Sequence, residues 1–182
     1  MGLDMYLTKE IYIGANYNFN RIEGVIEVFK NGERIPIDFK KVSYITEEAI
    51  YWRKSNQIHK WFVDNVQDGN DDCGKYYVST ENLTSLMETI EKLFSEVNPY
   101  INLSEIDFEK IEDEDFDKKV NEHKEDIENI CSKYLPSQSG CFFGGTSYNY
   151  YYFYDLDYTK EELNKLLKEE NKHCSFYYTS SW

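Results

Sequence analysis

The chain has 182 residues and a formal net charge of −14, from 20 Lys and Arg against 34 Asp and Glu. This acidic balance argues against direct nucleic-acid binding, because contact with the phosphate backbone requires a basic surface. Aromatic residues make up 17% of the chain, which excludes an acidic disordered protein. The length predicts a single domain over residues 1–182, with residues 105–128 as an acidic surface segment.

The sequence carries no recognisable signal for a membrane or a metal. No run approaches the roughly 18 apolar residues that cross a membrane, and the first residues do not form a secretion signal, so we expect a cytoplasmic protein without membrane contact. The four cysteines lack C-x-x-C spacing, which predicts free thiols, no metal site and no cofactor. His173 and Cys174 are adjacent, but zinc sites usually need two close ligand pairs. A homo-oligomer is compatible with the sequence.

Period-two alternation predicts β structure in the first third of the chain. Residues 1–13 alternate apolar and polar side chains, as in a half-buried strand. The dipeptide Asn31–Gly32 favours positive φ at both positions and predicts a hairpin. Residues 148–154 are almost all aromatic, so we expect them to form an interior strand. Other strands are expected at residues 24–30, 33–39, 42–45, 76–78 and 176–182.

A helix is predicted over residues 46–66. Thr46 is a favourable N-cap, and acidic residues follow it in the first turn. Spacing of 100° per residue places Trp52, Asn56 and His59 in one stripe of this helix. The order of elements predicts an α+β domain, with helices packed on a mostly antiparallel sheet. Further helices are expected from Ser79 or Thr80 to Asn98, in the later part of residues 105–135, and from Thr159 to about Lys172.

The predicted 46–66 helix carries side chains suited to a ligand. Trp52 can stack on a flat ring, Asn56 can donate and accept hydrogen bonds, and His59 transfers protons near neutral pH. A glycine-rich loop at residues 140–146 can present backbone N–H groups to an anion. Polar side chains in an apolar helix face more often complete a packed core than bind a ligand. Glycines in a loop more often serve the geometry of a turn. The predicted ligand-binding residues are Trp52, Arg53, Asn56, His59, Gly144, Thr146 and Tyr148.

Several long segments resemble an uncharacterised family of small bacteriophage and prophage proteins. The segments are MGLDMYL at residues 1–7, YWRKSNQIHKWFV at residues 51–63, DDCGKYYV at residues 71–78, the loop at residues 140–148, and SSW at residues 180–182. The resemblance implies a phage accessory protein in the cytoplasm of the host cell, and it carries over no catalytic residues. Members of the family have an acidic residue where this chain has Asn149.

Three functions are compatible with these patterns, and whether the chain is an enzyme stays open. The first is a phage accessory protein that counters host defence by binding a small ligand, such as a nucleotide-like signal, in an aromatic pocket. The second is a small hydrolase or transferase with His59 as general base beside Asp71, Asp72 or Cys73. The third is an acidic inhibitor, in which residues 105–128 mimic nucleic acid and bind a basic host protein.

Overall fold

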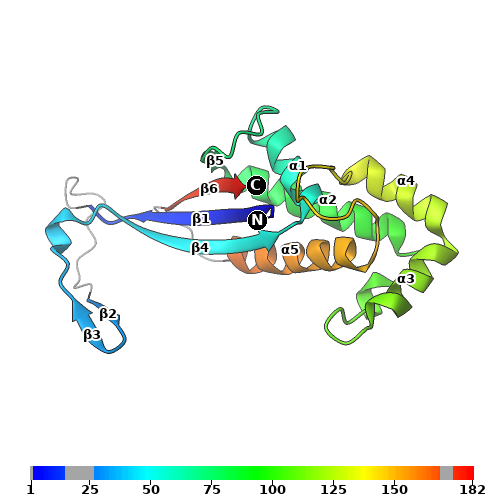
Figure 1. Cartoon of the computed structure of the whole chain (residues 1–182), viewed down its shortest axis with the longest axis horizontal. Helices are drawn as coiled ribbons and strands as arrows, with labels where there is room; N and C mark the ends of the chain where they lie inside the picture. Colours follow the sequence, from blue (N-terminus) through cyan, green and yellow to red (C-terminus); the bar gives the residue numbers. More distant parts are fainter. Residues whose placement is uncertain (1, 15–26, 169–173) are drawn as a thin grey trace.

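A four-stranded antiparallel sheet with helices packed on it forms the fold, which confirms the predicted α+β class (Figure 1). The computed structural model describes residues 2–14, 27–168 and 174–182. The strands follow the order β4-β1-β6-β5, with β1 (Asp4–Tyr12), β4 (Tyr44–Arg53), β5 (Tyr76–Val78) and β6 (Cys174–Ser181). The helices are α1 (Asn56–Asn65), α2 (Thr80–Val97), α3 (Asp113–Glu122), α4 (Lys124–Tyr134) and α5 (Tyr150–Lys168), with two short 3-10 turns, η2 (Phe39–Lys41) and η3 (Leu103–Glu105).

One face of the sheet is apolar and lies against helices. Met5 and Leu7 of β1 are fully buried, whereas Tyr6 between them is only half-buried, so the predicted alternation is confirmed. On β6, the ring of Tyr178 stacks on Phe62 of α1 with 4.1 Å between ring centroids. Burial of such large rings is a main source of stability, and it fixes α1 against the middle of the sheet.

The predicted helix over residues 46–66 is wrong in its first part, because residues 44–53 form strand β4. This strand pairs with β1 along its whole length, from Tyr12 opposite Tyr44 to Asp4 opposite Arg53. Backbone pairing over nine residue pairs outweighs the local cap signal of Thr46, and aromatic and β-branched residues suit a pleated surface. Trp52 therefore lies on a strand, and it does not share a helix with Asn56 and His59.

The predicted strand at residues 148–154 is also wrong, because these residues lead into helix α5. The buried positions of α5 recur at intervals of three and four, as expected for a helix with one apolar face. The backbone N–H of Tyr150 donates to the Asp117 carboxylate at 2.7 Å, which caps the first turn. Thr159, predicted to start a helix, lies inside α5 and is fully buried.

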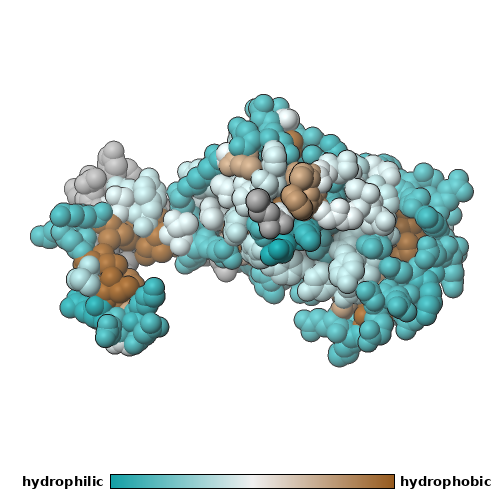
Figure 2. Space-filling model, viewed as in Figure 1, coloured by the Kyte–Doolittle hydropathy of each residue, from teal (hydrophilic) through white to brown (hydrophobic). Residues whose placement is uncertain are grey.

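Strands β1 and β4 continue past the helices as a two-stranded ribbon that leads to a small hairpin (Figure 1). This hairpin consists of β2 (Val28–Lys30) and β3 (Glu33–Ile35). Asn31 and Gly32 adopt φ values of 54° and 82°, so the predicted turn is confirmed. Figure 2 shows apolar residues at this end of the molecule, and among them Phe29, Ile35 and Ile37 are exposed.

Helices α3 and α4 carry the acidic segment at the end of the molecule opposite the hairpin (Figure 1). Their apolar stripe is thin, with Phe116 and Val120 buried on α3 and Ile127 and Cys131 on α4. All twelve acidic side chains of residues 105–128 are exposed or half-buried, as predicted for a surface segment. In the part of the chain that the structure describes, no helix has the length and apolarity that crossing a bilayer requires.

Candidate functional site

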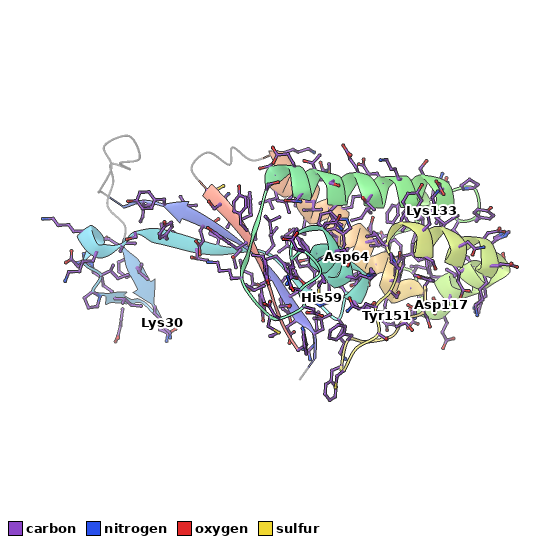
Figure 3. All side chains as sticks on the ribbon, turned by 90° about the horizontal axis from the view of Figure 1, so that it is seen from above. Lys30, His59, Asp64, Asp117, Lys133 and Tyr151 are labelled. Carbon is purple, nitrogen blue, oxygen red and sulfur yellow. The ribbon has the colours of Figure 1, made fainter. Side chains whose placement is uncertain are left out.

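A cavity of about 420 Å³ opens where α1 and α5 begin. Its walls come from the end of β4, the first turn of α1, the first two turns of α5 and the glycine-rich loop that precedes α5. Tyr151 lies near Asp117 at this end of α5 (Figure 3). The lining residues are Arg53, Lys54, Asn56, Gln57, Ser137, Gly144, Gly145, Ser147, Asn149, Tyr151, Tyr152 and Asp155.

The turn between β4 and α1 places two cations at the cavity. Lys54 has a left-handed backbone with φ of 62°, and its N–H donates to the Leu3 carbonyl at 2.8 Å. Gly144 packs against it, since a Cβ there would lie 3.1 Å from the Cβ of Lys54, and φ at Gly144 is 94°. Non-glycine residues rarely hold positive φ, and such strain concentrates at functional sites. The neighbouring Arg53 is exposed and lies 3.9 Å from the Asp4 carboxylate.

Asn56 fixes the glycine-rich loop to the start of α1. Its amide nitrogen donates to the carbonyls of Phe143 at 3.2 Å and Gly145 at 2.8 Å, and its oxygen accepts from the Gln138 N–H at 2.9 Å. The side chain is buried although it contributes to the cavity wall. Asn56 therefore shapes the cavity, and its polar atoms are already occupied by the loop.

Replacing Asn56 by alanine is expected to lower the free energy of unfolding by about 2–3 kcal/mol, because three hydrogen bonds are lost and buried groups stay unpaired. Asn65→Ala on the same helix is the matched control, since the exposed Asn65 makes one hydrogen bond, to Trp61. Urea denaturation of both variants measures the difference. Equal stability of the two variants would contradict the assigned role of Asn56.

Asp155 brings a carboxyl group to the same cavity from the second turn of α5. Its burial raises the pKa to about 6, and this rise is partly offset by the neighbouring Ser55 and Gln57. The Gln57 amide donates to Asp155 Oδ2 at 3.4 Å, which is a long hydrogen bond. The buried Ser55 hydroxyl lies close enough to lower the pKa, but it makes no well-formed hydrogen bond to any described residue. The polar groups around Asp155 are therefore incompletely paired.

His59 belongs to a buried network and not to the cavity wall. Its ring is fully buried, with Nε2 at 3.1 Å from Asp71 and Nδ1 at 2.7 Å from the Tyr178 hydroxyl. The ionised Asp71 carboxylate can only accept, so Nε2–H donates to it, and Nδ1 of the neutral ring then accepts from the Tyr178 hydroxyl. The Trp182 indole N–H donates to the same carboxylate at 3.0 Å. The network thus ties α1, β6 and the loop after α1 together.

Three of the predicted site residues line the cavity: Arg53, Asn56 and Gly144. Trp52 is buried on β4, where its indole N–H donates to Thr159 Oγ1 at 2.9 Å. Thr146 is exposed, and Tyr148 contacts the edge of Tyr152 outside the cavity wall. Trp52, Thr146 and Tyr148, like His59, do not line the cavity.

Sequence reasoning missed Lys54, Gln57 and Asp155 as site residues. Asp155 had a usable signal, because it lies on α5 between the buried Tyr152 and Thr159. An acid within the apolar stripe of a helix is rarely buried without a partner, so it marks a candidate site. That signal depends on recognising residues 150–168 as a helix.

Comparison of the chain with protein-family models, with curated proteins and with solved structures finds no match. Among the residues that the structure describes, which leave out His173, no group of three or more His, Cys, Asp or Glu side chains is arranged to hold a metal ion. The case for a function therefore depends on the geometry of the cavity.

Proposed function

We propose that the chain binds a small, anionic, nucleotide-like ligand in the cavity between α1 and α5. The observation that carries this proposal is the charge of the wall, which has Arg53 and Lys54 but only one acid, Asp155. The lining residues alone thus carry an excess of one positive charge on a chain with a net charge of −14, while Asp4, which does not line the cavity, lies 3.9 Å from Arg53. A phosphate or carboxylate at Arg53 and Lys54 would gain charge-assisted hydrogen bonds.

The shape and the remaining lining residues support a small molecule of this kind. A volume of about 420 Å³ falls in the range of ligand pockets, and the wall combines aromatic rings with a few polar groups. Lys54 has no acidic partner among the described residues, so its ammonium group is available. Tyr151 is 61% exposed and offers a ring face on which a flat base can stack.

The biological context of this proposal comes from the resemblance to phage proteins. A phage accessory protein in the host cytoplasm that sequesters a nucleotide signal would counter host defence without catalysis. The enzyme alternative gains no support from the site geometry, because both ring nitrogens of His59 are engaged and the ring has no exposed surface. A general base must reach its substrate.

Calorimetric titration with AMP, GMP and ribose 5-phosphate tests the proposal. The unaltered protein is expected to bind at least one of them, and Arg53→Gln with Lys54→Asn is expected to weaken binding about 10–100-fold through lost charged hydrogen bonds. Asparagine suits the left-handed backbone at position 54, so the fold should be kept.

Lys60→Gln is the matched control, because Lys60 is also on α1 but pairs with Asp64 and does not line the cavity. This variant should bind within about twofold of the unaltered protein, as expected for a surface substitution away from the site. If none of the three probes binds at millimolar concentration, the proposal is wrong.

A further inference from the structure

The cavity wall around Asp155 presents hydrogen-bond acceptors to a ligand. The Asp155 carboxylate accepts only one hydrogen bond from a described side chain, the 3.4 Å bond from Gln57. Because Gln57 uses its amide nitrogen for this bond, its amide oxygen remains as a second acceptor at the cavity wall. The two oxygens of the Asp155 carboxylate are adjacent acceptors, and such a pair matches a ligand edge that carries adjacent N–H donors.

We propose that the cavity selects guanine nucleotides, with Asp155 accepting both N1–H and the 2-amino group of the base. Guanine is the nucleobase whose Watson–Crick edge carries two neighbouring donors, and a carboxylate can accept both at once. Adenine and cytosine place a ring acceptor beside their single amino group, and that acceptor would face the carboxylate. Uracil has one N–H between two carbonyl oxygens, which the carboxylate would repel.

The other parts of the wall fit the rest of such a ligand. Arg53 ends β4 and Lys54 follows it, and these two side chains are the cations that a phosphate requires. Asp155 lines the cavity from helix α5. Tyr151 also lines the cavity and has an exposed ring, on which the purine can stack. This assignment rests on the proposed function, because it specifies the base of the anionic ligand proposed above.

Comparative titration with GMP, IMP, AMP and ribose 5-phosphate tests the selectivity. GMP is expected to bind about 5–100-fold more tightly than AMP, as a bidentate contact to a base edge discriminates by this amount. IMP lacks only the 2-amino group, so its affinity should lie about tenfold below that of GMP.

The Asp155→Asn variant separates the base contact from the phosphate contact. The GMP and AMP affinities of this variant should differ by no more than about threefold, since the amide offers one acceptor and adds a donor. Ribose 5-phosphate, which lacks the base, should bind at least as tightly, because a negative charge is removed from the cavity. Asp157→Asn removes the same charge from α5 at a residue outside this cavity and should keep the preference for GMP.

The possible failures are distinguishable. Equal binding of GMP, IMP and AMP by the unaltered protein would overturn the guanine assignment and leave the anionic site intact. A preference for GMP that persists in Asp155→Asn would overturn the role of Asp155. Absence of binding by every probe would overturn the proposed function together with this inference.

Discussion

His59→Ala is expected to lower the free energy of unfolding by about 2–4 kcal/mol. The substitution empties the space of a fully buried ring, which also contacts the edge of Phe143 with 5.2 Å between centroids. It leaves the buried Tyr178 hydroxyl without its partner and releases the Asp71 carboxylate from the network. Urea denaturation followed by fluorescence and far-ultraviolet circular dichroism measures the loss.

Two controls define what the His59→Ala result means. His123→Ala removes an exposed histidine and should change stability by under about 1 kcal/mol. Ribose 5-phosphate or nucleotide binding by His59→Ala should persist under conditions where the variant is folded, because His59 does not line the cavity. If His59→Ala kept full stability and lost ligand binding instead, the structural role of His59 would be wrong and the residue would belong to a functional site.

The features that the sequence predicted correctly are those set by short segments. The Asn31–Gly32 turn follows from the backbone preferences of two residues. The start of α2 follows from the Ser79 side chain, which accepts from the N–H of Asn82 in a capping box. In both cases the residues that decide the structure are within three positions of each other, so no knowledge of the rest of the fold is needed.

The strand at residues 44–53 depends on a partner about forty residues earlier in the chain. Its local signals favour a helix, with Thr46 as a cap and acids in the next turn. The pairing with β1 over nine residue pairs exists only once the sheet is assembled. The break at Lys54, with φ of 62°, then turns the chain into α1 and separates Trp52 from Asn56 and His59. A tertiary contact thus overrides the propensity of the segment.

The candidate site could be predicted only in part for the same reason. Arg53, Asn56 and Gly144 were identified from their chemistry, and each lies at the cavity because the β4–α1 turn and the glycine-rich loop meet there. Asp155 could not be recognised, since the aromatic run before it reads equally well as a buried strand. Residue type indicates which side chains can bind, and the path of the backbone determines which of them meet.

Asp155→Asn is expected to raise the free energy of unfolding by about 1–3 kcal/mol at pH 7.5. The pKa of Asp155 rises from 3.8 to about 6 because burial disfavours the charged form. At pH 7.5 the folded protein therefore holds an ionised carboxylate that it solvates less well than the unfolded chain does. The asparagine amide has nearly the same shape, can still accept from Gln57, and carries no charge.

The pH dependence of this gain is the decisive part of the prediction. Between pH 3.8 and about 6 the folded protein binds a proton that the unfolded chain has released, so the contribution of Asp155 to stability falls as pH rises through this window. The gain from Asp155→Asn should be complete above about pH 6 and should vanish by about pH 4. Urea denaturation of both proteins at about pH 7.5, 5 and 4 measures it. A variant that is less stable at pH 7.5, or a gain independent of pH, would contradict the burial of an unsatisfied carboxylate. A stabilised variant that has also lost its preference for GMP would show that Asp155 is retained for binding at a cost in stability.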